Sequence, residues 1–440
     1  MSVQRINARS WLLVLVLGAI AVLAVWIADN RALPGGSGEW YIAVGRVTGL
    51  EGTYLALATV VLLARVPWLD TAFGMPRLAT AHRWIGEGAL WLLVAHTVLI
   101  IWGYRIQAHA TVTHETRNVV LDLPDMLAAT VGLGMFVLVG IASLRIARRR
   151  LRYETWQFIQ LYVYLALVLS FAHEFATGDD FATHQLNRAL WIALYAVAGG
   201  LLLCFRLVVP VVRSWRHRLR VAEITVESPT STSIRITGQQ LDHWATQPGQ
   251  FMIWRFLSRR TWWEAHPFSL SERPRNESFR ITVGDGGDFT HRIRGLPLGC
   301  HVIAEGPFGV FLPDASTRPA LLIAAGSGIA PVRTMLESWP ETATDLTLVY
   351  RARSPHHFAL RNELDALAAR RRLTVHYVTG ARDTCLDLFD ADVLQTLVRR
   401  PLPEHVSFVC GPDGFTAGVT SALRAGGIPA ANIHSERFRL

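Results

Sequence analysis

The sequence predicts a multi-domain membrane protein: a six-helix transmembrane bundle, then an antiparallel β-barrel domain, then an α/β domain. Three observations support this fold class. Hydrophobic residues make up 51% of the 440-residue chain, and the long apolar runs are concentrated before about residue 212. The remainder alternates short β-rich runs with helical stretches, as soluble domains do. Arginines cluster at alternate ends of the apolar runs. We expect the three domains to occupy residues 1–215, 216–316 and 317–440.

Six apolar runs are long enough to cross a bilayer, which requires about 20 residues of helix. Their approximate bounds are 11–28, 41–64, 79–103, 123–146, 154–176 and 188–212. The first run follows Arg5 and Arg9 and could be mistaken for a signal peptide, but it is long for a signal core. Its removal would also leave an odd number of spans. We therefore expect it to be retained.

The formal net charge of +9 is carried entirely by arginine, because the chain contains no lysine. Only four arginines fall in the loops at the other ends of the spans. The clusters lie at 5–9, 65–77, 145–152 and 213–220, and the four others are Arg31, Arg105, Arg117 and Arg188. This asymmetry follows the positive-inside rule and predicts a multi-pass cell-membrane protein with its N-terminus and soluble half in the cytoplasm. The charge therefore indicates topology and not nucleic-acid binding.

The four cysteines form no metal-binding or disulfide pattern. Cys204, Cys300, Cys385 and Cys410 include no CxxC pair, and none lies in a predicted outer loop. Neither a disulfide framework nor a zinc site is expected.

His82 and His96 lie fourteen residues apart in the third apolar run. Fourteen residues is close to four helical turns, so both rings leave the same helix face, separated by roughly 21 Å along the axis. An imidazole in a membrane span is costly and usually marks a ligand or a pathway. Haem is the leading hypothesis, and satisfied polar groups in a helix bundle are the alternative.

A second histidine-bearing span is needed to complete a haem site. The fifth run supplies His173 near its outer end, and His96 also lies near the outer end of its span. We predict that His96 and His173 bind one haem iron from opposite sides, while His82 marks an inner level.

Three features resemble the ferric reductase-like transmembrane domain: the HRWIG segment that begins at His82, His96 fourteen residues later, and the YETW segment further along the chain. That superfamily includes ferric reductases and NADPH oxidases. The resemblance implies two b-type haems between the third and fifth helices, with an inner histidine four residues after the YETW tryptophan. Here that residue is Gln160, and an amide is a weak iron ligand. The inner haem is then five-coordinate on His82, held by another residue, or absent. We expect one firmly bound haem b and at most a weaker second.

Two further acids, Glu51 and Glu87, fall within predicted spans. They could pair with Arg83, solvate a proton path, bond near the altered inner site, or simply face a wet bundle interior. Neither is assigned to catalysis.

The segment after Arg220 alternates like an antiparallel barrel, with VAEITVES, TSIRITG and GQFMIWRF as its first strands. HPFS, a GDGGDFT loop and GPFG then follow in that order. This order resembles the FAD-binding barrel of the ferredoxin–NADP reductase superfamily. The resemblance implies that Phe268 and Ser269 contact the flavin ring and that Thr290 holds the pyrophosphate. The residues expected to bind FAD are His266, Pro267, Phe268, Ser269, Thr290, Arg292, Gly306, Phe308 and Gly309.

From Arg318 onward the pattern is that of an α/β domain. The strand PALLIAA runs into a turn of Gly326, Ser327 and Gly328, and Pro331 lies in the helix that follows. Glycines permit close approach to a pyrophosphate, and a helix N-terminus favours it. A GxG turn alone is a weak signal. It nevertheless is similar to the GxGxxP turn of ferredoxin reductase-type nicotinamide domains.

The same resemblance assigns residues near the end of the chain. Cys410, followed by Gly411 and Pro412, would approach the reacting nicotinamide carbon. Phe438 would cover the flavin ring, and Glu436 would be a polar neighbour of the nicotinamide. Cys410, Phe438 and Ser269 are thus the expected catalytic residues. Without this context, Cys410 would be interpreted as a small buried residue.

Arg351 and Arg353 follow the second strand of the α/β region, where an adenosine 2′-phosphate would lie. Guanidinium groups bind phosphate through paired hydrogen bonds. No acid directly follows this strand to select a free ribose hydroxyl. The pattern favours NADPH over NADH, with solvated surface arginines as the alternative.

These features together predict an oxidoreductase that passes electrons from cytoplasmic NADPH through FAD and haem b to an acceptor at the outer face. A ferric chelate, dioxygen and a redox protein all remain possible acceptors, because no motif in the outer loop 105–121 distinguishes them. The alternative is a membrane-anchored NAD(P)H:flavin reductase or electron-delivery module that serves a separate protein.

Overall fold

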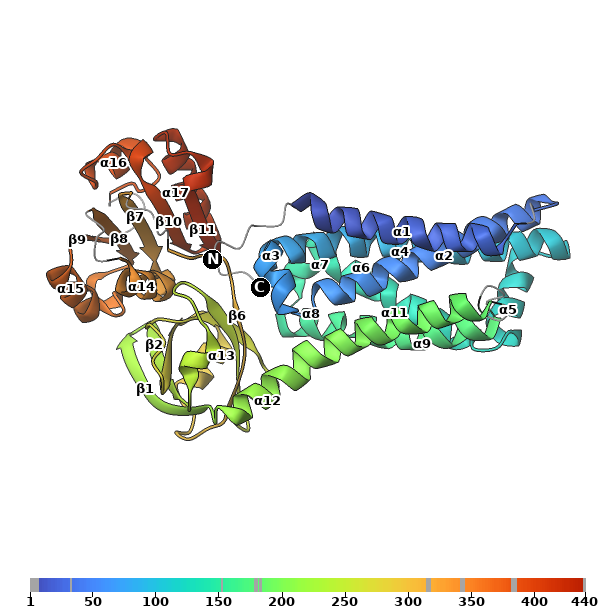
Figure 1. The fold of residues 1–440 in the computed structure, drawn as a ribbon, viewed down its shortest axis with the longest axis horizontal. Helices are drawn as coiled ribbons and strands as arrows, with labels where there is room; N and C mark the ends of the chain where they lie inside the picture. The colour runs from blue at the N-terminus through green and yellow to red at the C-terminus, as the bar shows by residue number, and fades with distance from the viewer. Residues whose placement is uncertain are drawn as a thin grey trace. The chain divides into compact units, whose positions relative to one another are not determined.

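A computed structural model of the chain describes residues 8–31, 34–151, 153–177, 181, 184–313, 318–340, 345–380 and 386–437. The chain divides into two compact units, Met1–Arg206 and Leu207–Leu440. Figure 1 shows that the first unit is built from helices, whereas the second contains all of the sheets.

The first unit contains long apolar helices joined by short ones. The long helices are α1 (Ala8–Asp29), α2 (Ser37–Leu62), α4 (Met75–Ala108), α6 (Met126–Ser143), α9 (Tyr162–Thr177) and α11 (Gln185–Leu203). The short helices are α3 (Pro67–Phe73), α5 (Val112–Asp122), α7 (Arg145–Arg150) and α8 (Tyr153–Gln160).

Every predicted apolar run is helical in the described part of the chain. Five helices or continuous helix pairs are long and apolar enough to cross a membrane. A sixth is reached only if α2 and α3, which meet at a bend of 89°, are counted as one span. A multi-pass protein is thus supported, and the number six stays a prediction.

Glycines bring α2 and α4 into close contact. A Cβ atom placed on Gly38 would lie 3.0 Å from the carbonyl oxygen of Gly103, and one on Gly45 would lie 3.0 Å from Ile100. Gly52 makes the same kind of approach to Leu93. Small residues on one helix face let two backbones pack closely in a membrane, where the hydrophobic effect gives little help.

The last apolar helix continues past its span. α11 passes through a π-helical segment, η1 (Cys204–Val208), into α12 (Val209–Arg216). The stretch Gln185–Arg216 has 32 residues, or about 48 Å of helix against a hydrocarbon core of about 30 Å. The end of this helix must therefore extend beyond the hydrocarbon.

The second unit begins with two three-stranded antiparallel sheets. One has the order β1-β2-β5 and the other β4-β3-β6. Their strands are β1 (Arg220–Ser228), β2 (Ser231–Thr237), β5 (Ser278–Gly284), β4 (His266–Ser269), β3 (Phe251–Phe256) and β6 (Val302–Phe308). Among the described residues, the isolated bridges Arg220↔His301 and Leu270↔Ile281 join them, together with a few backbone hydrogen bonds beside each bridge. The expectation of a barrel was therefore wrong in this respect: the strands form two sheets and no continuous ladder closes them.

The two sheets share one apolar core. It includes the fully buried side chains of Trp254 on β3, Phe279 and Ile281 on β5, and Ile234 on β2. Alternating strand residues point inward, as antiparallel sheets with one solvated face require. The short helices η2 (Leu241–Trp244) and α13 (Asp288–Ile293) also contribute to this core, with Trp244 and Phe289 among their buried residues.

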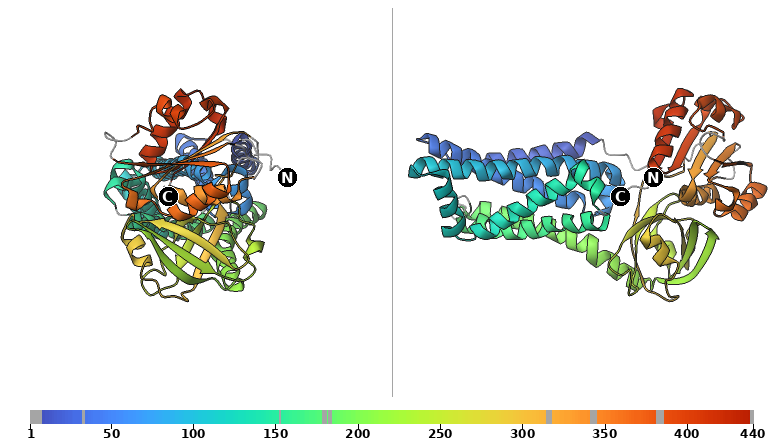
Figure 2. Two further views of the ribbon diagram at one scale, coloured as in Figure 1. Left: turned by 90° about the vertical axis from the view of Figure 1, so that its left-hand side faces the viewer. Right: turned by 180° about the vertical axis from the view of Figure 1, so that it is seen from behind.

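A five-stranded parallel sheet follows, in the order β11-β10-β7-β8-β9. Its strands are β7 (Ala320–Ala325), β8 (Leu346–Ala352), β9 (Leu373–Thr379), β10 (Val406–Gly411) and β11 (Ile433–Arg437). One face packs on α14 (Ile329–Ser338) and α15 (Arg361–Arg370), and the other on α16 (Ala391–Thr396) and α17 (Asp413–Ala425). Figure 2 shows the sheet between these two helical layers. This is the α/β architecture that the sequence predicts.

Candidate functional site

His82 and His96 both bond to carbonyl oxygens of α2. Nδ1 of His82 lies 3.2 Å from the oxygen of Thr59, and Nδ1 of His96 lies 2.8 Å from the oxygen of Gly45. A carbonyl oxygen only accepts, so each Nδ1 carries the proton and each Nε2 keeps a free lone pair. Metal-binding histidines commonly have this arrangement, in which the second ring nitrogen is held by an acceptor.

The ring of His96 occupies space left by a glycine. A Cβ atom on Gly49 would lie 2.6 Å from Nδ1 of His96. His173, on α9, lies near enough to His96 for the two rings to interact electrostatically. The two predicted outer ligands thus come from different apolar helices, α4 and α9, and their sharing of one haem iron stays a prediction.

Gln160, at the position where the resemblance implies an inner haem ligand, forms a hydrogen bond with a neighbouring helix. Gln160 is the last residue of α8, and its Nε2 donates to Oγ of Ser143 at the end of α6 over 3.1 Å. No histidine therefore faces His82 from this position. The residues present fit a haem at the level of His96 and His173, but not a bis-histidine haem at the level of His82.

Glu174, next to His173, lies at the centre of a polar cluster that we did not predict. Its Oε1 accepts hydrogen bonds from Thr53 on α2, at 3.2 Å, and from Tyr195 on α11, at 3.0 Å. The cluster ties three apolar helices together. An acid inside an apolar run is the sequence feature that indicates such a polar cluster, and Glu174 has this feature as Glu51 does.

In the β-sheet region, the HPFS segment forms β4 and supports a stack of three rings. The rings of His266 and Phe289 lie 3.8 Å apart at 27°, and those of Phe268 and Phe289 lie 6.2 Å apart at 16°. Pro267 lies between the two stacked β4 residues, and Ser269 is buried at the strand end. The stack places nearly parallel aromatic faces beside the predicted flavin contacts.

The GDGGDFT loop folds around the hydroxyl of Thr290. Its Oγ1 accepts hydrogen bonds from the amides of Gly286 and Gly287, each at 3.1 Å. A Cβ atom on either glycine would meet nothing within 4 Å, so the loop is open on this side. The open side of the loop leaves space for a ligand, while both amides donate to Thr290 in this structure; pyrophosphate binding here stays a prediction.

Arg292, expected near the phosphate, is bound to a carboxylate. Its Nη2 donates to both oxygens of the buried Glu264, at 2.5 and 2.7 Å. Glu264 also lies 3.4 Å from Nε2 of His266, which links this ion pair to the ring stack. This partner is not predictable from the sequence pattern, because Glu264 precedes the HPFS motif without belonging to it.

The GPFG turn is held by the helix that continues from the last span. The carbonyl oxygen of Gly306 accepts from Nη1 of Arg213 and from Nε1 of Trp244, each at 3.1 Å. The guanidinium of Arg213 also lies 4.3 Å from the centre of the Trp244 ring. Gly309 has φ +98°, a conformation that favours glycine, and Phe308 of the same turn is buried. α12 thus fixes the backbone of this turn directly.

In the parallel sheet, the Gly326–Gly328 turn and the Cys410–Pro412 segment lie at the same edge. β7 and β10 are neighbours, and strand order reverses between them: β8 and β9 extend one way, β11 the other. Open α/β sheets bind ligands outside the carboxyl ends of the strands at such a point. A Cβ atom on Gly328 would lie 2.2 Å from the carbonyl oxygen of Cys410.

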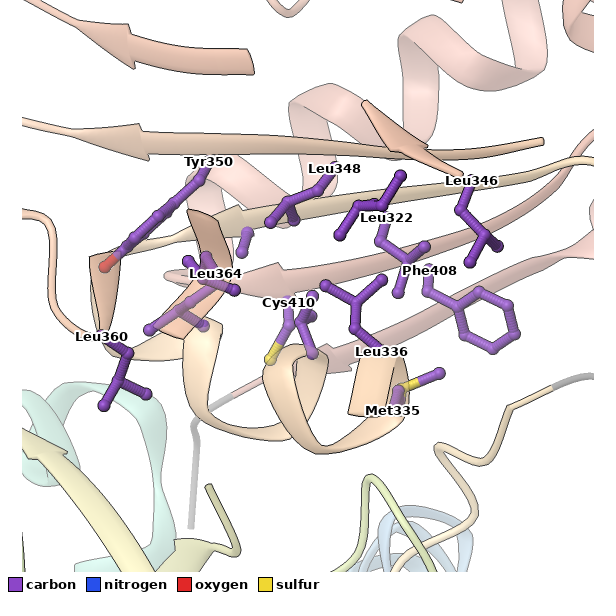
Figure 3. Packing of buried hydrophobic residues seen from close by; sticks show 14 of the residues in the cluster. Leu322, Met335, Leu336, Leu346, Leu348, Tyr350, Leu360, Leu364, Phe408 and Cys410 are labelled. Carbon is purple, nitrogen blue, oxygen red and sulfur yellow. The ribbon is translucent and has the colours of Figure 1, made fainter. Parts of the chain in front are cut away.

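The side chain of Cys410 belongs to the core under this edge (Figure 3), with Leu322, Leu336 and Phe408 in the same cluster. Burial raises the pKa of the Cys410 thiol well above its usual value, and the charge of Glu436 adds to the effect. Glu436 is paired with Cys410 in the β10–β11 register. The thiol is therefore a neutral group here and not a thiolate nucleophile.

Arg351, the penultimate residue of β8, pairs with Ala325, the residue before the glycine turn, and Arg353 is exposed just beyond the strand. Pro331 lies in the first turn of α14. These residues thus lie at the edge that carries the glycine turn. Phe438 lies outside the described residues.

Family models match the chain in three consecutive segments. Residues 48–171 match the ferric reductase like transmembrane component, residues 218–311 an FAD-binding domain, and residues 322–421 an oxidoreductase NAD-binding domain. The chain thus resembles a ferric reductase-like transmembrane component joined to an FAD- and NAD-binding reductase module. These matches indicate a membrane oxidoreductase with domains for FAD and a nicotinamide cofactor.

Known relatives of the ferric reductase-like chain match its reductase half. The ferredoxin reductase component of 3-ketosteroid-9-alpha-monooxygenase from Mycolicibacterium smegmatis is 32% identical over 235 residues, which cover 50% of this chain and 65% of the relative. The same component from Rhodococcus rhodochrous is 32% identical over 230 residues, covering 50% and 64%. The chain thus spans less than two thirds of these relatives. The flavohem-like FAD/NAD binding domain of nitric oxide dioxygenase from Vibrio cholerae is 22% identical, with 50% and 97% covered and a TM-score of 0.42.

Proposed function

We propose that the protein transfers electrons from NADPH on one side of the membrane to an acceptor on the other. The observation that carries this proposal is that His96, whose Nδ1 bonds to the Gly45 carbonyl oxygen, and His173 lie on two apolar helices of a chain that also matches FAD- and nicotinamide-binding domains. A flavin reductase acting only on soluble partners has no need of this pair. We propose that the side facing the reductase domains is the cytoplasm, on the distribution of arginines.

Within this proposal, His96 and His173 would hold a b-type haem. Haem and FAD, when bound, would supply the one-electron and hydride chemistry. The protein holds these groups in place. Gly49 leaves room for the His96 ring, and the Gly45 carbonyl fixes its proton on Nδ1. The site fits one such group well, so we propose one firmly bound haem.

At the reductase end, we propose that Phe268 and Ser269 contact the flavin ring and that Thr290 with its neighbouring amides holds the pyrophosphate. The glycine turn of Gly326–Gly328 would hold the nicotinamide nucleotide. Arg351 and Arg353 would bind the 2′-phosphate of NADPH. Cys410, whose thiol is buried and protonated in this structure, would then be a neutral group under the nicotinamide site and not a nucleophile.

The test is an electron-transfer assay across a sealed membrane. Purified protein is measured for haem and flavin content and reconstituted into vesicles that enclose an impermeant ferric chelate, with NADPH added outside. Parallel samples use dioxygen as acceptor. We expect enclosed acceptor to be reduced by the wild type and not by His96→Ala or His173→Ala. Equal reduction by these variants would refute the proposal.

A second function is an electron-delivery module for a separate protein. Two observations favour it: Gln160 is bonded to Ser143 where the resemblance implies an inner ligand, and the relatives are reductase components. In this case the histidine variants would keep full NADPH-driven reduction of a soluble acceptor, and the wild type would show no transfer into the vesicle.

A further inference from the structure

A short loop of the flavin-binding region exposes two adjacent tryptophans to solvent. The loop, which we call the aromatic loop, covers residues 257–264 between β3 and β4. The side chains of Trp262 and Trp263 are 60% and 51% exposed, and Leu257 is 38% exposed. Arg259 and Arg260, in the same loop, are also exposed. Tryptophan combines a large apolar ring with a polar N–H, so adjacent exposed tryptophans indicate a surface that is half apolar and half wet.

The aromatic loop is held rigidly in this exposed arrangement. Nη1 of Arg255 donates to the carbonyl oxygens of Trp262 and Trp263, at 3.1 and 3.0 Å. Oγ1 of Thr261 donates to the carbonyl oxygen of Phe256 at 2.8 Å. These hydrogen bonds hold the backbone of both tryptophans in place. The two indole rings are therefore exposed by the folded conformation of the loop.

The loop lies at the end of the β-sheet region where the chain arrives from the membrane. The amide of Leu257 donates to the carbonyl oxygen of His301 at 2.9 Å, and His301 forms a bridge with Arg220, the first residue of β1. β1 begins four residues after α12 ends at Arg216. α12 continues the last apolar helix, and Trp215 on it is 68% exposed.

We propose that the aromatic loop binds the lipid headgroup region of the bilayer on the reductase side. Tryptophan is enriched at the membrane–water interface, where its ring lies among acyl chains and its N–H bonds to water or headgroups. Arg259 and Arg260 complement anionic headgroups, which attract basic segments near the membrane. The bilayer is the occupant because one backbone hydrogen bond (Leu257 to His301) and one isolated bridge (His301 to Arg220) join the loop to the segment that leaves the membrane. A soluble protein partner lacks that argument.

The proposal has a consequence for the flavin site. The aromatic loop leads directly into β4, which carries the HPFS segment, and its last residue, Glu264, binds Arg292. Lipid contact at Trp262 and Trp263 would therefore hold the predicted flavin contacts at a fixed depth below the membrane surface.

The test measures contact between these tryptophans and lipid in the full-length protein. Wild type and W262F/W263F are placed in nanodiscs with and without lipids brominated near the headgroups, which quench nearby tryptophan fluorescence. We expect the double variant to lose part of the quenchable fluorescence. The matched control is W339F, because Trp339 is 1% exposed in the α/β core. Its quenchable fluorescence should equal that of the wild type. Equal quenching in wild type and W262F/W263F would overturn the proposal.

A second variant keeps the test independent of the tryptophans. R259Q/R260Q should quench like the wild type in zwitterionic nanodiscs and more weakly than the wild type in nanodiscs containing phosphatidylserine. Flavin content is measured in every variant to confirm folding. If quenching of R259Q/R260Q matches the wild type in both lipids, the basic residues do not bind headgroups and that half of the proposal is refuted. A change in the fluorescence of Trp262 and Trp263 that appears only when a soluble protein is added, and not with lipid, would contradict the whole proposal.

Discussion

Gly328 and Cys410 meet at the switch point of the parallel sheet so closely that a Cβ atom on Gly328 would lie 2.2 Å from the Cys410 carbonyl oxygen. Backbone contact of this kind cannot be relieved by moving a side chain. The turn after β7 and the end of β10 are therefore fixed relative to each other, and this juxtaposition defines the predicted nicotinamide site.

The first prediction follows from that contact. Gly328→Ala should raise the KM for NADPH about tenfold or more, because overpacking of this kind costs about 1–3 kcal/mol. Flavin content should be retained. Gly414→Ala is the control, since a Cβ there meets nothing within 4 Å. Steady-state kinetics of both variants measure the effect, and an unchanged KM in Gly328→Ala would show that the turn does not bind the nucleotide.

The second prediction concerns the room around His96. Gly49→Ala should reduce haem content although both histidines remain, because the new methyl group would lie 2.6 Å from Nδ1 of His96. Gly86→Ala is the control, with its nearest neighbour at 3.8 Å. Reduced-minus-oxidised spectra report the b-type absorbance. Full absorbance in Gly49→Ala would contradict the assignment of His96 as a ligand.

The third prediction concerns the inner level. Gln160→His should increase the haem content from about one towards two per chain, because imidazole is a far better iron ligand than an amide. Ser143→Ala removes the partner of Gln160 without adding a ligand and should leave the content unchanged. Iron and haem quantification measures both. Two tightly bound haems in the wild type would refute the single-haem proposal.

The fourth prediction tests the choice of nucleotide. Arg351→Ala should weaken NADPH binding about tenfold and leave NADH nearly unaffected, since a guanidinium recognises the 2′-phosphate that NADH lacks. Arg370→Ala, at the end of α15, is a control arginine away from this strand. Ratios of kcat/KM for the two nucleotides give the measurement. Equal losses for both would mean that Arg351 does not select NADPH.

The fifth prediction is a pH dependence. Burial acts to raise the pKa of Glu363, but hydrogen bonds and charge from Arg280 on β5 and Arg333 on α14 outweigh it and hold the pKa below its ordinary value. A lowered pKa in the folded state stabilises the protein above the unfolded value and loses that contribution as the pH falls through the folded value.

Glu363→Gln should accordingly destabilise the reductase half by about 1–2 kcal/mol at neutral pH, a value reduced for the partial exposure of Glu363. The difference from the wild type should begin to shrink as the pH falls below the ordinary glutamate pKa of about 4.3 and should vanish only below the lowered pKa of the folded state. Asp365→Asn, an exposed neighbour, serves as the control. The temperature of flavin release reports stability, and a difference independent of pH would contradict the ion-pair explanation.

Much of the architecture was predictable because long-range periodicity determines it. Apolar length predicted the spanning helices, and alternation followed by a glycine turn predicted the order of antiparallel and parallel strands. The sequence could not predict that the two sheets do not close into a barrel, since closure depends on hydrogen bonds at single bridges such as Arg220↔His301. Local sequence does not encode the presence or absence of a continuous ladder there.

The candidate site divides in the same way. His96 and His173 were predictable because histidine is conspicuous in an apolar run. The partners that orient them were not, because the Gly45 carbonyl is a backbone group and its role depends on how α2 packs against α4. Glu264 and Glu174 were missed for a related reason: their importance comes from partners far away in the sequence, Arg292 and Tyr195.

The close packing of α2 on α4 has a mechanical consequence. With Gly38 against Gly103 and Gly52 against Leu93, neither helix can slide along the other without driving a backbone into a side chain. The packing therefore keeps the carbonyl oxygens of Thr59 and Gly45, both on α2, in line with the imidazoles of His82 and His96 on α4, so the orientation of both rings depends on the glycines of the neighbouring helix.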